Sequence, residues 1–598
     1  MSDFTELREE GVVTQAEFEA MLRRWLMKMS ARYVPVACFF LAVALILVLV
    51  PTTQPNGAGG LRAGATGAGV AGGPTSQEAA SGGASSGAAT PATVAAGGGP
   101  AGPVAQPAGL GSSQGITNGN YAAGSSSGVA KTGVACHPGV RQFPWSKYGP
   151  NCVAAFQGNN GGNTAPGVTG STITLTYRLA NSTQQSAITA LAGAANINQN
   201  DIVSDLQSYI NFFNSQFELY GRKVVLKTYQ GQGDYIAEDQ GQDLGATQAD
   251  AVTVHDMGAF ADVTFPLQAS QAYEEDLAAE HVIGTGAVGL SQQWFEQHAP
   301  YEYSAYSRTG TTALEETSAT VCRRLAGMPA IFAGDPVYQR SNRVFGIIYP
   351  DTPLYKAEVD TFQQQLAGCG VKAARVIGYS INIATFQQQA VSAMAQMKAA
   401  NVTTLLCACD PILPIFLTQA ADQQNYVPEW VAAYFGDPVS REYDQKEWSH
   451  TISGGWQWPA LATTEAFKAF QTGYPGKQPA ETPPSSPAYY YVAYYMLMQV
   501  FDGLQAAGPN LTPSTFEQGI FSLPASDPGD VVGGQWTFGQ NHFAPISSFQ
   551  WVWWNPNAVS QFDNTKGAYQ WCNGGAIYLE NNLAALGGPN QQLNCFGK

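Results

Sequence analysis

The chain has 598 residues, of which 45% are hydrophobic and 12% are charged, and its formal net charge is −16. This length is enough for several domains or for one large two-lobed domain. The acidic balance argues against nucleic acid as a partner, because no basic patch outside the N-terminal region offsets phosphate repulsion.

Residues 1–33 predict a polar, amphipathic helical segment on the cytoplasmic side of a membrane. Thr14 and Glu17 in "LREEGVVTQAEFEAMLRRWL" form the capping-box pattern that begins a helix. The "EGVVTQAEF" core is similar to the short SHOCT-type helical module. An ordinary amphipathic helix lying near the membrane explains the same pattern, and we prefer that interpretation because short motifs match by chance.

An uncharged apolar run follows, "YVPVACFFLAVALILVLV" at residues 33–50. It is long enough to cross the hydrocarbon layer, which takes about 20 residues. The positive charges on its N-terminal side are Arg23, Arg24, Lys28 and Arg32. The positive-inside rule therefore predicts one transmembrane anchor at 34–52 in the cell membrane, with the N-terminus cytoplasmic and the C-terminal domain extracellular or periplasmic. A cleaved signal peptide is the alternative, but this run is longer than a usual signal-peptide core.

Residues 53–135 consist almost entirely of Gly, Ala, Ser, Thr, Pro and Gln, with charges only at Arg62, Glu78 and Lys131. Such a tract buries too little apolar surface to fold, so it predicts a disordered linker. A Gly-rich random coil of this length has a root-mean-square reach of about 50 Å. The linker therefore predicts an outer domain that works at some distance from the bilayer.

From Cys136 to the C-terminus at residue 598, strand-like and helix-like segments alternate. The expected strands are "STITLTYRL", "GRKVVLKTYQ", "ADAVTVHDM", "AEHVIGTG", "RVFGIIYPD", "KAARVIGYS", "VTTLLCACD", "EWVAAYFGD" and "TISGGWQW". The expected helices include 201–220, 290–298, the segment ending in "LAGCG", the segment ending at Lys398, and 413–423. This alternation predicts an α/β fold with parallel sheets flanked by helices, and it places a ligand at the carboxyl ends of the strands.

Eight of the nine cysteines follow the apolar run, an even number that fits disulfide bonds in an exported domain. The pairs that we expect are Cys136 with Cys152, Cys322 with Cys369, and Cys572 with Cys595. The sequence leaves the connectivity open, above all for Cys407 and Cys409, which flank one residue. We expect no metal, because a closed zinc site needs four ligands and the six His are scattered.

A series of segments resembles the type I periplasmic binding proteins of the branched-chain amino acid and amide family, the solute receptors of ABC importers. The segments are "GVTGSTITLTYRL", "INFFNSQFELYGRKVVLKTYQGQGD", "HVIGTGAVGLSQQWFEQHAPYEYS", "RVFGIIYPD", "CDPILPIFLTQAADQQNYVPEWV" and "SPAYYYVAYYMLMQVFDGLQAAG". They cover about residues 168–560 in the family's order. The resemblance implies a two-lobed fold with three crossings between the lobes. Lobe 1 would comprise about 168–307 and 459–530, and lobe 2 about 308–458 and 531–560.

The same resemblance implies a binding protein, without enzymatic activity or cofactor, that closes on a small molecule and presents it to an ABC transporter permease. The alternative is a sensor, in which the same two lobes report the ligand to a signalling partner. The membrane anchor and linker would keep the receptor near its permease at a raised effective concentration.

Loops at the carboxyl ends of the expected strands are the candidate ligand contacts. In lobe 1 they contain Asn181, Ser182, Ala259, Phe260, Thr285, Gly286 and Ala287. In lobe 2 they contain Asp351, Asp410, Tyr434, Asp437 and Trp456. Backbone N–H groups and hydroxyls there suit a carboxylate, acidic groups suit an ammonium, and aromatic rings suit apolar parts. Structural roles compete at four positions: Asp351 and Asp410 as helix caps, Phe260 as core, and Trp456 as a residue packed between the lobes.

Two departures from the family bear on the ligand. "GAFADVTF" places a bulky Phe where a small Gly/Ser-rich cradle is usual, and the first loop lacks Thr-Gly-Pro and carries the insertion "LAGAANINQND". The expected ligand is an amino acid or amide-like metabolite, or equally another small polar or aromatic one.

Three motifs suggest enzymes but fail on context. "GTGAVG" matches the dinucleotide fingerprint, yet it does not follow the opening strand of a domain. "GSSQG" and "GSSSG" match the hydrolase pattern, but both lie in the linker, where no strand–helix elbow holds the serine. We therefore expect no catalytic residues.

Overall fold

The computed structural model describes residues 126–598 with the exception of 182–198, 266–267, 474–486, 527–533 and the single positions 305, 541, 590 and 598. The expected cytoplasmic segment, the transmembrane anchor and the linker up to residue 125 therefore lie outside the described residues. Within the described part of the chain, no helix combines the length and the apolar character that a membrane span requires.

The last residues of the expected linker are ordered. Strand β1 (Gly128–Val129) pairs antiparallel with β2 (Ala135–Cys136), and Ala130 between them is buried. The Nζ atom of Lys131 donates a hydrogen bond of 2.8 Å to the carbonyl of Asn214, which ties this hairpin to the first lobe. The disulfide between Cys136 and Cys152 closes the same small unit. Composition alone did not reveal these contacts, which begin before the expected domain boundary at Cys136.

The first lobe forms around a four-stranded parallel sheet in the order β4-β3-β5-β6. Its strands are β3 (Thr172–Leu179), β4 (Lys223–Gln230), β5 (Ala261–Asp262) and β6 (Ile283–Gly284). Six consecutive residues of β3 are buried, as expected for a strand covered on both faces. Because all four strands run the same way, their carboxyl ends lie at one edge of the sheet.

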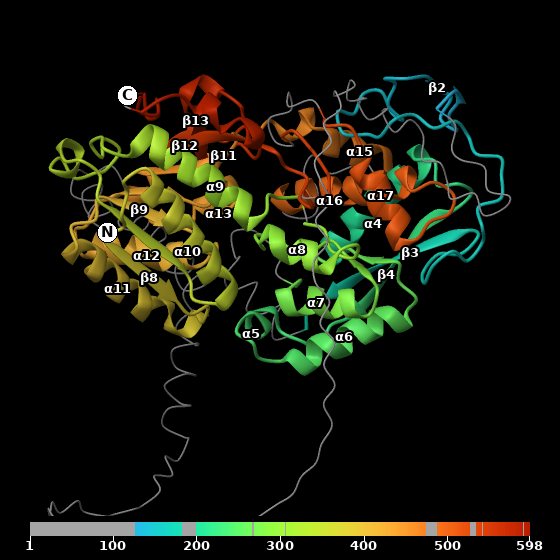
Figure 1. Cartoon of the computed structure of the whole chain (residues 1–598), viewed down its shortest axis with the longest axis horizontal. Helices are drawn as coiled ribbons and strands as arrows, with labels where there is room; N and C mark the ends of the chain where they lie inside the picture. The colour runs from blue at the N-terminus through green and yellow to red at the C-terminus, as the bar shows by residue number, and fades with distance from the viewer. Residues whose placement is uncertain are drawn as a thin grey trace, which may run out of the picture. The chain divides into compact units, whose positions relative to one another are not determined.

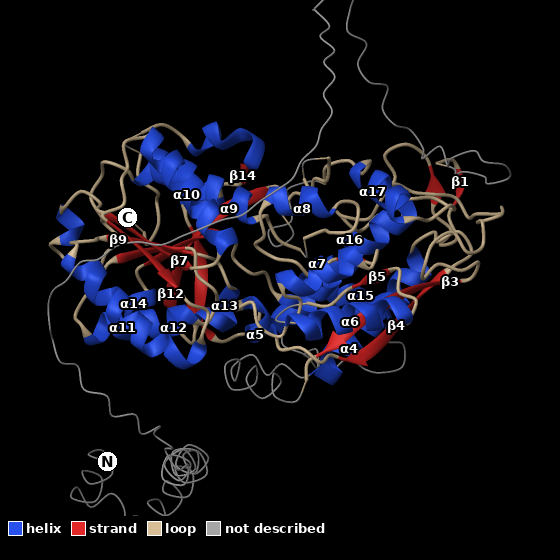
Figure 2. Ribbon diagram, turned by 60° about the horizontal axis from the view of Figure 1, so that its bottom comes forward, coloured by secondary structure: helices blue, strands red, loops and turns tan. Residues whose placement is uncertain are grey.

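Helices cover both faces of this sheet (Figures 1 and 2). They are α4 (Gln199–Gln216), α5 (Tyr235–Asp239), α6 (Leu244–Asp256), α7 (Gln271–Ala279), α8 (Gln292–His298), α15 (Glu465–Gly473), α16 (Pro487–Ala506) and α17 (Pro513–Phe521). A single-turn 3-10 helix, η3 (Leu461–Thr463), precedes α15. Helix α16 packs against α4 and α17, so a segment from late in the sequence completes the first lobe's core.

One expected strand is a helix. The segment "ADAVTVHDM" lies in α6, where Ala251 and Val254 are fully buried whereas Val252 is 39% exposed. Burial at a spacing of three residues is the helical pattern, whereas a half-buried strand would bury alternate residues. The β-branched residues of this segment suggested a strand, but the packing positions follow the helical period. The strand in this part of the chain is β5, two residues long.

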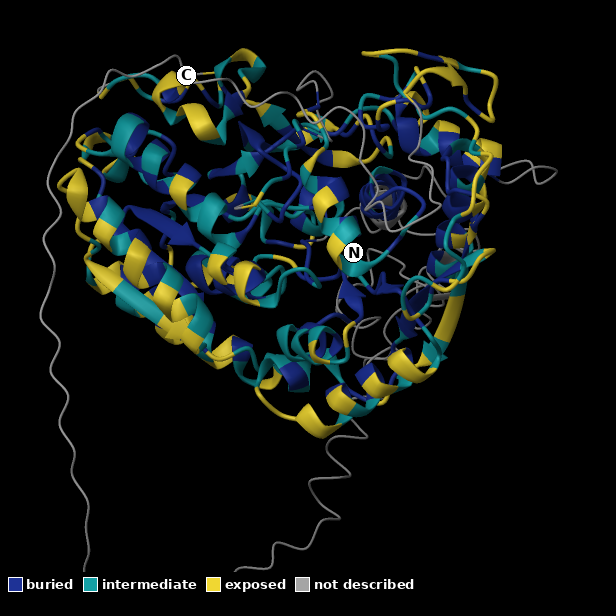
Figure 3. Cartoon of the chain, turned by 45° about the vertical axis from the view of Figure 1, so that its right-hand side comes forward, coloured by how far each residue is buried: buried dark blue, intermediate teal, exposed yellow. Residues whose placement is uncertain are grey.

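The second lobe forms around a larger sheet in the order β13-β12-β11-β10-β9-β7-β8, with β14 paired to β12. Its strands are β7 (Phe345–Pro350), β8 (Arg375–Tyr379), β9 (Thr404–Cys407), β10 (Glu429–Ala432), β11 (Thr451–Gly455), β12 (Ser548–Val559), β13 (Lys566–Trp571) and β14 (Tyr578–Leu579). Strands β7 to β11 are parallel, β12 is antiparallel to β11, and β13 is antiparallel to β12. The strands are mostly buried, and exposed residues lie on the outer turns of the surrounding helices (Figure 3).

The helices of the second lobe alternate with its parallel strands. They are α9 (Gly310–Thr320), α10 (Pro353–Gly368), α11 (Ile383–Ala399), α12 (Leu413–Gln423), α13 (Gly436–Ser440) and α14 (Gln445–Trp448). Shorter helical turns are η1 (Val321–Leu325), η2 (Tyr338–Arg340), η4 (Asn573–Gly575) and η5 (Glu580–Leu586). The strand–helix alternation expected from the sequence is therefore present, and the α/β fold class is confirmed.

Three segments cross between the lobes and are hydrogen-bonded to one another. The amide of Ser304 donates to the carbonyl of Phe543 at 3.0 Å, and the amide of Ile546 donates to the carbonyl of Ser307 at 3.3 Å. The guanidinium of Arg308 donates to the carbonyl of Gly454 at 2.9 Å. These bonds join the crossing segments into one connection between the two sheets.

The structure contains four disulfides in its described part. Three are the pairs expected from the sequence, Cys136–Cys152, Cys322–Cys369 and Cys572–Cys595. The fourth joins Cys407 to Cys409 at the end of β9, a pairing that the sequence left open. All eight cysteines of the expected exported domain are thus paired.

Removing the Cys322–Cys369 disulfide by a double Cys→Ser substitution should lower the stability of the second lobe. Its ends are 47 residues apart, so the lost loop constraint corresponds to about 4 kcal/mol in the chain-entropy account. The matched control is the same double substitution at Cys407 and Cys409, which are two residues apart and constrain almost no chain. Urea unfolding without reductant measures both, and an equal loss in the two variants would contradict this account.

Candidate ligand-binding cleft

A cavity of about 620 Å³ lies between the two lobes. From the first lobe it is lined by α5 and the residues that follow it, by the start of α7, and by the loop after β6. From the second lobe it is lined by the N-terminus of α10 and the loop after β8. The loops that follow β4, β6, β7 and β8 are all strand–helix connections at carboxyl ends of parallel strands, where α/β folds bind ligands. The volume is in the range of small-molecule sites.

The lobes touch at the edge of this cavity. The side-chain amide of Gln240, just after α5, donates a hydrogen bond to the carbonyl of Ile381 in the loop after β8. Both residues line the cavity. The contact therefore joins one wall of the cleft to the other.

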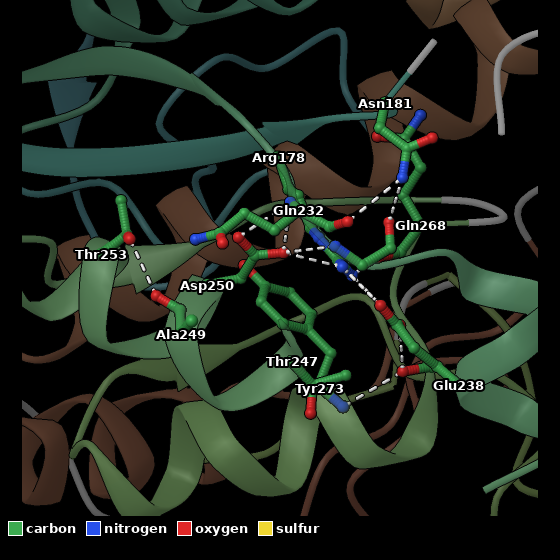
Figure 4. A network of polar contacts seen from close by, with 12 residues as sticks. Arg178, Asn181, Gln232, Glu238, Thr247, Ala249, Asp250, Thr253, Gln268 and Tyr273 are labelled. Carbon is green, nitrogen blue, oxygen red and sulfur yellow. Dashed lines mark hydrogen bonds and ion pairs between the residues drawn. The ribbon is translucent and has the colours of Figure 1, made fainter. Parts of the chain in front are cut away.

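A buried ion-pair network supports the first lobe's wall (Figure 4). Arg178, near the end of β3, lies 2.5 Å from Glu238 of α5 and 2.8 Å from Asp250 of α6, and all three side chains are at most 2% exposed. Its guanidinium also donates to the carbonyl of Gln268 at 2.9 Å and lies over the ring of Tyr273, 4.5 Å from its centre. One cation thus holds four separate segments in place.

The two carboxylates of this network bind further groups. Asp250 accepts hydrogen bonds from the amides of Gln232 and Gly233 in the loop after β4. Glu238 accepts a 2.6 Å hydrogen bond from the hydroxyl of Ser270, the residue that caps α7. The network therefore fixes the loop after β4, α5 and the start of α7, which form most of the first lobe's side of the cleft.

A second pair of buried carboxyls lies under the loop after β6. Burial raises the pKa of Glu274 to about 8, and burial together with the charge of Glu274 raises the pKa of Glu302 well above its usual value. At neutral pH, at least one of these two carboxyls is therefore protonated. A Cβ atom at Gly286 would lie 2.2 Å from the carbonyl oxygen of Thr264, so that position needs glycine, and a Cβ atom at Gly284 would lie 2.1 Å from an oxygen of Glu274. These carboxyls fix the path of the loop and are not among the residues that line the cavity.

Asp239 lies at the end of α5, and a carboxylate of the second lobe, Asp410, contributes to its pKa. Burial raises its pKa to about 7, a hydrogen bond from Tyr235 opposes the shift, and the charges of Glu238 and Asp410 add to it. Asp239 and Tyr235 belong to the first lobe, whereas Asp410 belongs to the second. Acidic groups of the two lobes therefore approach each other across the cleft.

Of the candidate residues expected from the sequence, Ala287 and Asp351 line the cavity. Ala287 lies in the loop after β6 and is 2% exposed. Asp351 follows β7 and is exposed, while Thr352 is the residue that caps α10 by accepting from the amide of Tyr355. The cap role that competed for Asp351 therefore belongs to its neighbour.

Five further candidates in the first lobe have different positions. Ala259 and Phe260 are at most 2% exposed, and Phe260 belongs to the first lobe's core. Thr285 is buried, and its hydroxyl donates to the carbonyl of Asp262 at 3.1 Å. Gly286 packs against the carbonyl of Thr264 as described above, and the Asn181 amide donates to the carbonyls of Gln232 and Gly233. None of these five lines the cavity, and Ser182 lies outside the described residues.

The remaining candidates in the second lobe are held by structural contacts. Asp410 accepts from the hydroxyl of Tyr379 at 2.6 Å and from the amides of Ile412 and Leu413, which begin α12. Asp437 is buried and accepts from the hydroxyl of Ser560 and the amide of Tyr569. Asp410 therefore stabilises the start of α12, Asp437 joins α13 to Ser560 and to β13, and neither lines the cavity.

Tyr434 and Trp456 lie where the cores of the two lobes meet. The Tyr434 hydroxyl donates to the carbonyl of Trp456 at 2.6 Å, and the Tyr434 ring packs against both cores. The Arg308 guanidinium lies 6.0 Å from the centre of the Trp456 ring. Both aromatic residues thus belong to the crossing region, where a change in the angle between the lobes would alter their contacts.

The sequence interpretation missed the residues around α5, Tyr235, Asp239, Gln240, Gln242 and Leu244, and the loop after β8 with Ser380, Ile381 and Asn382. Both segments follow parallel strands, so the rule that selected the other loops applies to them as well. The signals were "QGQGDY" after β4 and "GYSIN" after β8, two polar turns at the ends of correctly expected strands.

Among the described residues, no group of three or more His, Cys, Asp or Glu side chains is arranged to hold a metal ion. The cleft offers carboxylates, amides, hydroxyls and aromatic rings. Such a set binds a small molecule through hydrogen bonds, charge and apolar contact.

No protein-family model matches the sequence, and no curated protein matches it at a significant level. Solved structures do match. An ABC transporter substrate-binding protein from Aeropyrum pernix is 7% identical, with a TM-score of 0.48 over 67% of this chain and 95% of that chain. A solute-binding protein from R. palustris in complex with 4-hydroxybenzoate is 12% identical, with a TM-score of 0.46 over 67% and 96%.

A leucine-, isoleucine-, valine-, threonine- and alanine-binding protein from Brucella ovis, in a closed conformation, is 12% identical, with a TM-score of 0.46 over 68% of this chain and 95% of that chain. A type 1 periplasmic binding protein from Bordetella pertussis Tohama I is 12% identical, with a TM-score of 0.45 over 67% of this chain and 99% of that chain. This is the family that the sequence resembled.

Replacing Arg178 with Met should destabilise the first lobe strongly. It leaves Glu238 and Asp250 buried without their cation, which typically lowers the free energy of unfolding by about 3–5 kcal/mol. The control is Lys356→Met, which breaks the exposed pair with Asp360 and should leave stability unchanged. Urea unfolding followed by tryptophan fluorescence compares the two, and equal stability of both variants would show that the network is dispensable.

Proposed function

We propose that this protein is a membrane-anchored extracytoplasmic solute-binding protein that captures a small polar metabolite and presents it to an ABC importer. The observation that carries the proposal is the cavity of about 620 Å³ whose walls are strand-end loops of two separate sheets. A molecule bound there contacts both lobes at once.

Binding by such a cleft favours a closed arrangement, because contacts to both lobes exist only when the lobes are together. The crossing region suits this motion. Its three segments are joined by a few backbone hydrogen bonds and by the contacts of Arg308, Tyr434 and Trp456. The permease would then distinguish the ligand-bound form by the relative position of the lobes.

Anchoring rests on the apolar run at 33–50 and the positive charges before it. A tethered receptor stays near its permease, and its effective concentration there depends on linker length. The eight paired cysteines support placement outside the cytoplasm, because disulfides persist in oxidising compartments.

Ala272 lines the cavity from α7, and Ala272→Trp should fill part of it and abolish ligand binding. In a thermal-shift screen of small polar metabolites, the unaltered protein should gain stability with its ligand, about 2.7 kcal/mol at a ligand concentration 100 times Kd. Ala279→Trp, on the same helix but exposed and outside the cavity, should keep the full gain. A shift that survives Ala272→Trp would place the ligand elsewhere.

Deleting residues 34–52 should release the protein from the membrane fraction after cell lysis without changing its ligand-induced thermal shift. The reason is that the proposed anchor and the cavity share no residues. Fractionation followed by immunodetection measures the release. Continued sedimentation with membranes at high salt would contradict the anchor.

A further inference from the structure

The charged side chains that line the cleft, among the described residues, are all acidic. Among the described residues that line it, the charged side chains are Glu238, Asp239, Glu275 and Asp351, and none is Lys, Arg or His. Residues 182–198, which follow β3 outside the described part of the chain, contain no Lys, Arg or His in their sequence. An anionic ligand would therefore meet carboxylates and no compensating cation on the described walls.

Two of the four carboxylates have partners of their own. Glu238 is paired with the buried Arg178. Glu275 accepts hydrogen bonds of 2.8 Å from the Gln271 side chain and from the Trp294 indole. Glu238 and Glu275 therefore have fewer oxygen lone pairs free to accept hydrogen bonds from a ligand.

The other two carboxylates, Asp239 and Asp351, lie on opposite lobes. Asp239 has Tyr235 as its hydrogen-bond donor, and Asp351 is exposed and accepts no side-chain hydrogen bond from the described residues. Lys356, in the first turn of α10, is 2.8 Å from Asp360, which is the main cause of its raised pKa; the charge of Asp351 adds only a smaller part, and Lys356 does not line the cavity. One carboxylate on each wall is thus available to a positive ligand.

Helix N-termini, the usual anion-binding feature of this fold class, are already capped at the cleft. Asp234 accepts from the first amides of α5, Thr352 from the amide of Tyr355 in α10, and Asn382 from the amide of Ala384 in α11. Pro353, the first residue of α10, has no N–H to offer. These caps therefore take up helix-terminal amides that would otherwise face a carboxylate or phosphate.

Aromatic and apolar groups complete the lining. Tyr235 and Tyr355 line the cavity, one from each lobe. Leu244 and Val288 also line it and are 50% and 38% exposed. Aromatic faces attract cations, and exposed apolar side chains at a cavity favour a ligand with an apolar frame.

We propose that the ligand is an organic cation, an ammonium or amidinium group on a small apolar frame, held between Asp239 and Asp351. This inference rests on the proposed solute-binding function and names its substrate class. The cation would lie between the two lobes, so its charge would offset carboxylates on both.

The test is isothermal titration calorimetry of the full chain with probes of matched size and different charge. The cationic probes are 1,4-diaminobutane and benzyltrimethylammonium, the anionic probes are succinate and benzoate, and the neutral probes are 1,4-butanediol and benzyl alcohol. At least one cationic probe should bind, and its matched anionic and neutral probes should bind more weakly by about tenfold or more, the expected effect of a charge-assisted contact.

Variants locate the contact. Asp239→Asn and Asp351→Asn should each weaken binding of the cationic probe by about tenfold or more. Asp360→Asn, on α10 with Asp351 at its start, lies outside the cavity and should leave binding unchanged. Asp351 is exposed, so its variant keeps the test valid even if Asp239→Asn disturbs folding.

The pH dependence gives a second readout. The groups that face Asp239 are Tyr235, Glu238, Tyr355 and Asp410, and burial raises the Asp239 pKa to about 7. A proton and an organic cation compete for this carboxyl, so affinity should rise from pH 6 to pH 8. Asp239→Asn should remove that rise.

Three outcomes would overturn the inference. Stronger binding of succinate or benzoate, abolished by Ala272→Trp, would show that the ligand class is wrong while the solute-binding function stands. Binding of Ca²⁺ alone, lost in Asp239→Asn, would indicate a metal in place of an organic cation. Absence of binding by both cationic probes would reject the class, and a metabolite screen without any shift sensitive to Ala272→Trp would reject the proposed function as well.

Discussion

The first wall of the cleft depends on one buried cation. Arg178 sits near the carboxyl end of β3, and its guanidinium reaches Glu238, Asp250 and the carbonyl of Gln268. Each partner belongs to a different segment: Glu238 to α5, Asp250 to α6, and Gln268 to the loop before α7. Helix α5 has five residues, too few to be stable alone, so its position comes from this tertiary ion pair. Because the charges are almost fully buried, the arrangement tolerates little displacement: a shifted partner would leave a buried charge unpaired.

The opposite wall is built differently. At the N-terminus of α10, Thr352 caps the helix and Asp351 stays exposed beside it, so the second lobe presents polar groups on local turns. One polar contact between the walls is the hydrogen bond from Gln240 to the carbonyl of Ile381. Polar contacts of this kind can form and break with little change inside each lobe. Such contacts between two rigid walls therefore suit a hinge motion of the lobes.

Sequence patterns predicted the strands well because parallel strands are nearly continuous apolar runs between helices, as in β7 and β9. They failed at α6, whose β-branched residues suggested a strand although its buried residues, such as Ala251 and Val254, follow the helical period. For the site, the rule that ligands bind at the carboxyl ends of parallel strands selected Ala287 and Asp351, which line the cavity, but the sequence interpretation did not select Asp239. The rule gives the correct edge of the sheet but not which side chain at that edge points into the space between lobes. Asp410 and Asp437 show why: their carboxylates accept amides nearby, and this use is decided by tertiary contacts that a single sequence does not reveal.

Charge distribution links the two walls to the ligand. Burial is the main cause of the raised pKa of Asp239, and the negative charge of Asp410, which comes from the other lobe, adds to it. Bringing the lobes together therefore brings like charges together, which opposes closure when the cleft is empty. An organic cation between the lobes reverses the sign of that interaction, since it is attracted to both walls. Its affinity for the closed arrangement would then exceed its affinity for the open one, which is the condition for a ligand to drive closure. An anion placed in the same cleft would add to the repulsion and would favour the open arrangement.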